Sequence, residues 1–287
     1  HMVRSRNPEF QSCMRAYAES FQGILDLGRK NVTHLLGVFS QVADYPQGAH
    51  ETMTALLEGW MPEIMKLFSV PLVRDAAAFR KELEEDIWDK LVRTVKNHAK
   101  QPFSPDDLLE NLVTGFASGY YLYFRSVYND WQLGRSNLSQ PQRAANFFFI
   151  RENCYGSMFR YNGEGEFNIP YGGMSYNRKN MAAKIANMFS RETKRVLRGT
   201  QLCCMDFEDF LQEIEINSGD FMFLDPPYDT EFSDYDGRPF GKDEQARLAE
   251  VLKHTPAKFL LIIKNTPYIE NLYSETFYIR RFDKQYT

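Results

Sequence analysis

The chain has 287 residues, which is long enough for one large domain or for a catalytic domain with a smaller lobe, and we favour two lobes. Its hydrophobic content of 43%, charged content of 25% and formal net charge of −4 exclude a domain-sized disordered tail and a uniformly basic surface. The four cysteines lack the spacing of zinc ligands or of a disulfide framework, so we expect no metal. Because the chain shows neither a secretory signal nor a run of about eighteen apolar residues, we expect no membrane contact and a cytoplasmic location.

The first half of the sequence has the pattern of helices. Residues 1–10 look like a cloning leader, and we set them apart from the fold. From residue 11 to 104, apolar residues three and four positions apart predict a helical N-terminal region. Its clearest helix spans residues 75–98, with an apolar stripe that consists of Phe79, Leu83, Ile87, Leu91 and Val95. Ser104 is placed to cap a further helix that runs from Asp106 through Tyr123 and ends in a run of aromatic residues.

Between residues 144 and 177 the pattern changes to loops and hairpins, because Asn, Gly, Tyr and charged residues alternate there without helical periodicity. A helix from Met181 to Phe189 is expected to follow. Residues 151–198 contain nine Lys or Arg and four acidic residues, a local net charge of +5. In an acidic chain, such a local basic segment is where a polyanion would bind. We therefore assign residues 105–198 to a recognition lobe.

From residue 199 to 287 the pattern alternates between strands and helices. The strands expected from it are 200–205, 220–224 and 259–263, and the helices are 207–214 and 243–254. This alternation predicts an α/β sheet with parallel, buried central strands. Residues 199–287 are therefore the expected catalytic α/β part.

The motif Asp225-Pro226-Pro227-Tyr228 directly follows the strand expected at 220–224. Open α/β sheets bind ligands at the carboxyl ends of their strands. Two consecutive prolines fix φ and remove two amide donors, so the carbonyls of this turn can act as outward-facing acceptors. Such acceptors suit a reaction at an exocyclic amine such as that of adenine. This amine is a poor nucleophile because its lone pair is delocalised into the ring, and it needs acceptors for both N–H groups to recover nucleophilic character.

The Asp225 carboxylate and the Pro226 carbonyl can supply these two acceptors. Tyr228 offers a face on which an extruded base can stack, a contact worth about 1–3 kcal/mol. The alternative explanation is a strand followed by a proline-rich turn with a capping acid and a packing tyrosine. Related motifs also serve enzymes that methylate RNA bases or protein amides, so the motif indicates the reaction type better than the substrate.

The segment from Phe147 to Gly172 resembles the signature of the DNA adenine methyltransferase (Dam) family, with Phe159-Arg-Tyr-Asn and then Gly165-Glu-Phe-Asn-Ile-Pro-Tyr-Gly as its core. The resemblance covers roughly residues 110 to 287, in the motif order of the family's α group. It implies a Rossmann-like methyltransferase sheet with a helical N-terminal region and a helix/hairpin DNA-recognition lobe. The implied activity is site-specific transfer of a methyl group from S-adenosylmethionine to N6 of a flipped adenine in double-stranded DNA. A restriction-modification role and association with the nucleoid through DNA would follow.

The resemblance also implies roles for residues of the recognition lobe. Tyr155 matches the residue that enters the DNA stack, and Arg160 matches the arginine that reads a guanine beside the target adenine. An aromatic ring and a guanidinium fork suit these roles. The simpler structural explanations are a buried hairpin aromatic for Tyr155 and a salt bridge with Glu164 or Glu166 for Arg160. The other residues expected to bind DNA or to shape the loop are Ser157, Asn162, Asn168, Pro170 and Tyr171.

For the cofactor, Cys204-Met-Asp-Phe207 resembles the family motif in which an acid and an aromatic residue contact the adenine of S-adenosylmethionine. Asp206, Phe207 and Asp225 are therefore the expected cofactor contacts, although Asp206 equally suits a helix N-cap. The family's Gly-rich cofactor segment is not found in the sequence. A partner chain or a missing N-terminal segment would then complete the cofactor site. The alternatives are a catalytically impaired, sequence-specific DNA-binding module and an RNA adenine methyltransferase.

Overall fold

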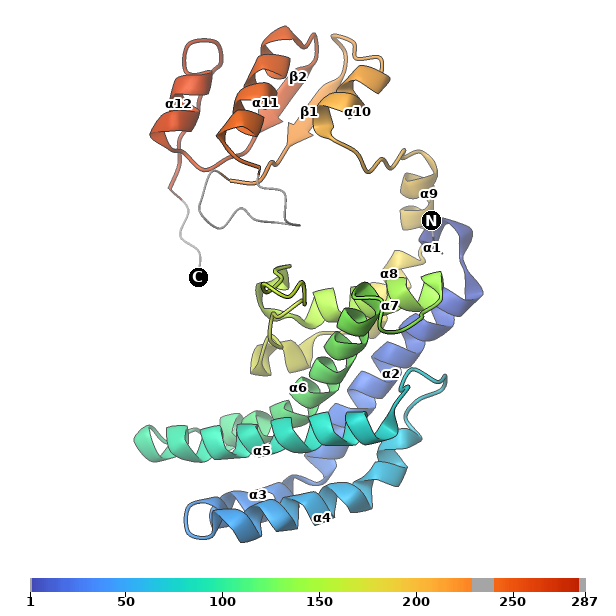
Figure 1. The fold of residues 1–287 in the computed structure, drawn as a ribbon, viewed down its shortest axis with the longest axis vertical. Helices are drawn as coiled ribbons and strands as arrows, with labels where there is room; N and C mark the ends of the chain where they lie inside the picture. Colours follow the sequence, from blue (N-terminus) through green and yellow to red (C-terminus); the bar gives the residue numbers. More distant parts are fainter. Residues whose placement is uncertain (1, 229–239, 284–287) are drawn as a thin grey trace. The chain divides into compact units, whose positions relative to one another are not determined.

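A computed structural model describes residues 2–228 and 240–283 of the chain, which divides into two units, His1–Thr200 and Gln201–Thr287. The described residues are mostly helical, and their strands form a small parallel two-stranded sheet in the second unit (Figure 1). Residue 1 and parts of the expected catalytic region, residues 229–239 and 284–287, lie outside the described residues. Among the helices that are described, none is long and apolar enough to cross a membrane.

The helices of the first unit are α1 (Met2–Ser5), α2 (Pro8–Lys30), α3 (Val32–Val42), α4 (Pro46–Met65), α5 (Ala76–Lys100), α6 (Pro105–Gln132), α7 (Gln140–Asn153), α8 (Met181–Met188) and α9 (Arg191–Arg198), with 3-10 turns η1 (Tyr155–Ser157) and η2 (Met174–Arg178). The predicted helices α5 and α6 are confirmed. Asp75 caps α5, and Ser104 accepts a hydrogen bond from the Asp107 amide at the start of α6. The α6 helix runs on to Gln132, past the predicted Tyr123, because its aromatic run packs in the core.

Helices α5 and α6 lie side by side (Figure 1), and glycines on α6 permit their close approach. A Cβ atom added at Gly119 would lie 2.9 Å from the Leu83 Cα atom and from the Glu82 carbonyl oxygen of α5. One added at Gly115 would lie 2.9 Å from the Ile87 Cα atom. A side chain at either position would therefore push the helices apart. This packing fixes the position of α6, whose side chains hydrogen-bond the loop described below.

One hydrophobic core joins the helices of the first unit. Tyr17 of α2 stacks on Phe149 of α7 at a centroid distance of 4.9 Å, and Ser20 of α2 hydrogen-bonds the Tyr120 hydroxyl of α6 at 2.7 Å. The regions expected at 11–104 and 105–198 therefore share one core.

Residues 1–10 were expected to lie outside the fold, but the structure includes the end of this segment. Asn7 caps α2 by accepting a hydrogen bond from the Phe10 amide. The Phe10 side chain is buried, with its ring centroid 6.0 Å from that of Phe189. The origin of the segment as a cloning leader stays a prediction, whereas its exclusion from the fold was wrong.

The elements of the second unit are α10 (Phe207–Glu213), β1 (Phe221–Leu224), α11 (Lys242–His254), β2 (Lys258–Leu261) and α12 (Pro267–Tyr273). Strands β1 and β2 are parallel, with Phe221 opposite Lys258 and Leu224 opposite Leu261. The expected strand at 200–205 is wrong: this segment has no regular secondary structure, because no described strand pairs with it. The α/β alternation is thus present as a two-stranded sheet with helices.

The strands of the second unit were expected to be buried, and this is wrong for one face of the sheet. Met222 and Leu224 pack with α11 and α12 in the core of the unit. Phe221 and Phe223 point to the other face and are 64% and 61% exposed, beside the exposed Leu260 of β2. Among the described residues, the helices of this unit pack on one face of the sheet, so each strand alternates between exposed and half-buried residues.

Candidate functional site

A candidate site in the first unit is the loop between α7 and α8. Two antiparallel bridges, Cys154 with Tyr171 and Tyr161 with Phe167, close it into a hairpin-like shape. The Tyr155 amide also donates to the Pro170 carbonyl at 2.9 Å. An outgoing segment, residues 155–161, therefore lies along a return segment, residues 165–171. This agrees with the loop and hairpin pattern expected from the sequence for residues 154–177. For residues 144–153 that expectation is wrong, because they form the second part of helix α7, whose apolar side chains Phe149 and Ile150 are buried in the core.

Tyr155 is presented at the start of this loop and is 58% exposed, so the alternative of a buried hairpin aromatic is not what the structure shows. The backbone turns sharply after it, because Gly156 has a φ of 63° and Ser157 a φ of 52°. Glycine takes a left-handed conformation without a steric penalty, whereas serine does so at some cost. The Gly156 amide donates to the Tyr176 hydroxyl at 3.1 Å, which holds the turn.

Arg160 lies on the outgoing segment and is exposed. Among residues 2–228 and 240–283, no carboxylate lies within ion-pair distance of its guanidinium. Glu166, one of the two acids considered as its partner, binds Arg135 at 3.1 Å instead. The salt bridge that would have explained Arg160 structurally is therefore absent from the described part of the chain.

Asn162 and Tyr171 have hydrogen-bond partners inside the loop. The Asn162 side chain accepts from the amides of Glu164 and Glu166 at 3.0 and 2.9 Å, which shapes the turn between the two segments. The buried Tyr171 hydroxyl donates to the Asn177 side chain at 2.8 Å, and burial raises the pKa of Tyr171. DNA contact by either side chain stays a prediction.

The remaining predicted loop residues differ in exposure. Ser157 and Pro170 are exposed, and the Pro170 carbonyl is the acceptor for the Tyr155 amide. Asn168 is half-buried, and its side-chain oxygen is buried without a hydrogen-bond partner. The loop thus offers Tyr155, Ser157 and Arg160 on its outgoing segment, whereas its return segment is turned toward the core.

The basic segment 151–198 is largely uncompensated. Lys184 pairs with Glu152, and the Lys179 ammonium lies 3.4 Å from the centroid of the Tyr176 ring. For the other cations, the described residues provide no carboxylate at ion-pair distance; these are Arg151, Arg160, Arg178, Arg191, Lys194, Arg195 and Arg198. The nearby charges of Arg6 and Arg198 lower the pKa of Lys194. This segment therefore carries a local positive field suited to phosphate groups.

A candidate site in the second unit is the corner after β1, at Asp225-Pro226-Pro227-Tyr228. Asp225 is exposed, and the two prolines and Tyr228 are half-buried. The Pro227 carbonyl accepts a hydrogen bond from the Gln245 side-chain amide at 2.8 Å. The corner therefore combines an exposed carboxylate with a turn that α11 holds in place.

Gln245 was missed by the sequence analysis. It is fully buried, and its side-chain oxygen has no hydrogen-bond partner. The signal was its spacing, because Gln245 shares the buried face of α11 with Leu248, Ala249 and Leu252. A polar residue on an apolar helical face indicates a specific partner, which here is the carbonyl of the corner.

Asp206 and Phe207, the other expected cofactor contacts, lie at the start of α10. Asp206 is the N-cap, accepting from the Glu208 amide at 2.9 Å, and it binds Arg247 of α11 at 2.6 Å. The Glu208 amide and Arg247 together lower the pKa of Asp206. The Arg247 guanidinium lies 4.9 Å from the centroid of the Phe207 ring, and that ring also packs against Phe240. The N-cap alternative for Asp206 is thus confirmed, and a cofactor contact stays a prediction.

No group of three or more His, Cys, Asp or Glu side chains that could hold a metal ion occurs among the described residues. Within the second unit, the corner provides acceptors, a carboxylate and an aromatic ring. Within the first unit, the loop and the basic segment provide an exposed aromatic ring and positive charge. These groups suit the binding of a base and of a phosphate backbone.

The chain was compared with known proteins. Residues 72–287 match the family described as D12 class N6 adenine-specific DNA methyltransferase. The chain is similar to the Type II methyltransferase M.CviBI of Paramecium bursaria Chlorella virus NC1A, with 35% identity over 50% of this chain and 52% of the relative. It is also similar to the Type II methyltransferase M1.LlaDCHI of Lactococcus lactis subsp. cremoris, with 25% identity over 75% of this chain and 78% of the relative.

A further relative is the DNA N-6-adenine-methyltransferase of Escherichia phage P1, with 28% identity over 76% of this chain and 29% of the relative. The chain thus spans about half the length of the viral relative and less than a third of the phage protein. The matched region includes both the loop at 154–172 and the corner at 225–228.

Proposed function

Because the chain belongs to the family of D12 class N6 adenine-specific DNA methyltransferases, we propose that it methylates N6 of a flipped adenine at a specific site in double-stranded DNA. The observation that carries this proposal is the corner after β1, where an exposed Asp225 carboxylate precedes two prolines and the Pro227 carbonyl is anchored by Gln245. A fixed pair of acceptors suits an amine with two N–H groups to satisfy.

In this proposal the side chains of the corner bind and orient the base. The Asp225 carboxylate and the Pro226 carbonyl accept the two N–H groups of the adenine amine. Tyr228 stacks on the base, which offsets part of the free energy needed to extrude it from the duplex. Gln245 keeps the turn in position through the Pro227 carbonyl.

S-adenosylmethionine is the proposed cofactor, and it would supply an electrophilic methyl group when bound. The residues of the second unit fit its adenosine part: Asp225 offers an exposed carboxylate, and Phe207 offers a half-buried ring. Asp206 is held by Arg247 and by the start of α10, so a contact with the cofactor would use the carboxylate oxygen that these groups leave accessible. The protein's contribution would then be positioning and electrostatics.

A further segment is proposed to complete the cofactor site in a Rossmann-like sheet, supplied by a partner chain or by additional N-terminal sequence. The support is the uncovered face of β1 and β2, where Phe221, Phe223 and Leu260 are exposed. Parallel strands are ordinarily covered on both faces. The sequence of this chain contains no Gly-rich cofactor segment, and this favours a second candidate function, a DNA-binding module without transferase activity. In both cases the protein would act on DNA in the cytoplasm.

A transfer assay tests the proposal. Labelled S-adenosylmethionine is incubated with double-stranded DNA and with wild type, Asp225→Ala or Glu213→Ala, where Glu213 is an exposed acid at the end of α10. We expect label in the DNA with wild type and Glu213→Ala, and none with Asp225→Ala. Equal incorporation by the two variants would remove Asp225 from the mechanism. DNA binding without cofactor binding or transfer in wild type would support the DNA-binding module.

A further inference from the structure

One face of α6 carries polar side chains that hydrogen-bond the return segment of the loop, residues 165–171. The Gln132 side chain donates to the Gly165 carbonyl at 3.3 Å. The Asn129 side chain accepts from the Phe167 amide at 2.9 Å and donates to the Phe167 carbonyl at 3.1 Å. The bonded loop residues, Gly165 and Phe167, are two positions apart. Because the residue numbers on α6 fall as those on the loop rise, α6 runs antiparallel to the return segment.

The same pattern continues two residues further along the loop, at Ile169. The Tyr121 hydroxyl donates to the Ile169 carbonyl at 2.8 Å, and the Arg125 guanidinium donates to the same oxygen at 3.2 Å. The Phe167 and Ile169 side chains are buried in the core of the first unit. Helix residues thus replace a neighbouring strand as the hydrogen-bond partners of this backbone, and its buried carbonyls are satisfied.

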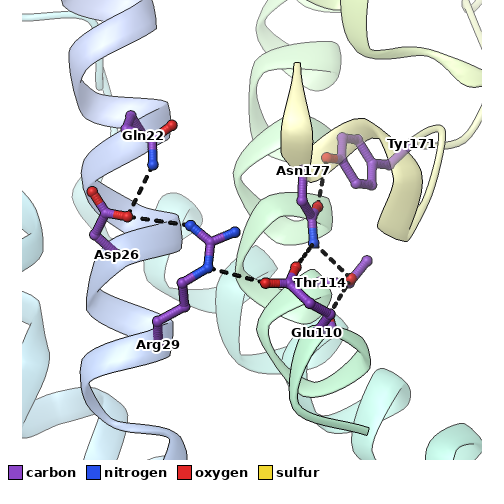
Figure 2. Close-up of polar contacts among 7 residues, drawn as sticks. All are labelled: Gln22, Asp26, Arg29, Glu110, Thr114, Tyr171 and Asn177. Carbon is purple, nitrogen blue, oxygen red and sulfur yellow. Dashed lines mark hydrogen bonds and ion pairs between the residues drawn. The ribbon is translucent and has the colours of Figure 1, made fainter. Parts of the chain in front are cut away.

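Asn177 holds the far end of the loop against α6 (Figure 2). Its buried amide donates to Thr114 at 3.0 Å and to Glu110 at 3.2 Å, while its oxygen accepts from Tyr171. Glu110 is also bound by Arg29 of α2 at 3.1 Å. Burial opposes ionisation of Glu110, but the hydrogen bonds from Arg29 and Asn177 prevail and lower its pKa.

The return segment in turn positions the outgoing segment. The Asn168 amide donates to the Arg160 carbonyl at 3.3 Å, and the Tyr155 amide donates to the Pro170 carbonyl at 2.9 Å. The backbones of Tyr155 and Arg160 are therefore placed by residues whose own backbone α6 fixes. These hydrogen bonds set the backbone from which the two exposed side chains project.

We propose that the polar face of α6, made of Glu110, Thr114, Tyr121, Arg125, Asn129 and Gln132, is a template that sets the conformation of the DNA-reading loop before DNA binds. This inference rests on the proposed function and makes Tyr121 and Asn129 positioning residues for sequence discrimination. Ordering a loop residue costs backbone conformational entropy. Because the template orders the loop during folding, the free energy of DNA binding does not include the free energy of ordering the loop.

Two variants and a matched control test the template. Tyr121→Phe removes only the hydroxyl that donates to Ile169. Asn129→Asp keeps the acceptor for the Phe167 amide and loses the donor for its carbonyl. The control is Tyr123→Phe, because Tyr123 is also a buried tyrosine of α6 but its hydroxyl accepts from the Arg74 and Asp75 amides, away from the loop.

Each 287-residue protein captures duplexes from a randomised DNA pool, and sequencing before and after capture gives the enrichment of the preferred site. Hydrogen exchange of residues 165–171 is measured without DNA. For Tyr121→Phe we expect about two- to tenfold lower enrichment, the range of one hydrogen bond, together with faster exchange. Asn129→Asp should lose more, and Tyr123→Phe should keep wild-type enrichment and exchange.

Wild-type enrichment by both Tyr121→Phe and Asn129→Asp would overturn the template, as would an equal loss in Tyr123→Phe. Unchanged exchange in both loop-contacting variants would also overturn it. If wild type enriches no sequence, the proposed function fails and the role in recognition fails with it. The two failures are distinguishable, because loss of the template alone leaves selection by wild type intact.

Discussion

Replacement of Gln245 by leucine separates the stability of the second unit from the position of its corner. Gln245 is fully buried, donates to the Pro227 carbonyl at 2.8 Å, and leaves its own side-chain oxygen without a partner. Leucine is close to glutamine in volume, and position 245 lies on the same buried face of α11 as Leu248 and Leu252. Gln245→Leu therefore removes both polar atoms without opening a large cavity.

The two polar atoms contribute to stability with opposite signs. The bond to Pro227 stabilises the fold by about 0.5–1.5 kcal/mol, whereas a buried unpaired oxygen costs about 1–3 kcal/mol. The half-buried Pro227 carbonyl is partly accessible to water after the change. We therefore expect the free energy of unfolding of Gln245→Leu to stay within about 1 kcal/mol of wild type. Methyl transfer should fall by about tenfold or more, mainly in kcat, because the acceptors lose their fixed position.

Urea titration and transfer of labelled methyl groups to DNA measure the two effects on the same preparations. Gln245→Glu is a companion variant, because a carboxylate buried there has a raised pKa and cannot donate to Pro227 when ionised. Its stability deficit should be smallest and constant below about pH 4.3, the ordinary glutamate pKa, and should grow as pH rises from there toward the raised pKa of the folded state. Wild-type kcat in Gln245→Leu would refute the positioning argument, and a loss above about 3 kcal/mol would refute the stability estimate.

Other variants test the loop, the helix packing and the start of α10. Arg160→Ala should lose about 1–3 kcal/mol of discrimination at one guanine, measured by selection from randomised duplexes, and retained selectivity at every position would contradict its assignment. Gly119→Ala should destabilise the protein by about 1–3 kcal/mol, because the added methyl group clashes with α5. Gly59→Ala, whose methyl group meets open space in α4, should stabilise the protein by about 1 kcal/mol. Equal melting temperatures of the two variants would be inconsistent with this packing. Because an α10 amide and Arg247 lower the pKa of Asp206, its contribution to stability is present above about pH 3.8 and is lost as pH falls through the lowered pKa. Asp206→Asn should remove this dependence from acid melting curves, and an unchanged acid slope would argue against it.

The helices of the first unit were predictable because local signals define them. Apolar residues at four-residue intervals from Phe79 to Leu91 define the buried face of α5. The hydroxyl of Ser104 caps the start of α6. Both signals depend on residues within one turn of each other, so they can be recognised without a tertiary structure.

The errors concern features that depend on distant neighbours. Residues 200–205 have an apolar pattern, but a strand requires a partner, and no described strand lies beside them. Phe221 and Phe223 suggest a buried strand, yet their burial depends on whether a second layer covers the sheet. Gln245 was missed because its partner is a backbone carbonyl 18 residues away, which side-chain patterns do not reveal.

The two functional segments are held in the same way, although one lies in each unit. In the first unit the Asn129 amide donates to the Phe167 carbonyl, and in the second the Gln245 amide donates to the Pro227 carbonyl. Both amides are buried on helices, and neither candidate segment is part of the two-stranded sheet of the described residues, although two antiparallel bridges close the loop. A loop that must present its outer face to DNA has only its inner face for anchoring, and a proline-rich turn has lost its own amide donors. Buried donors on neighbouring helices meet both requirements, so the rigidity of the proposed DNA-reading loop and of the proposed acceptor corner should depend on these amides more than on any exposed charge.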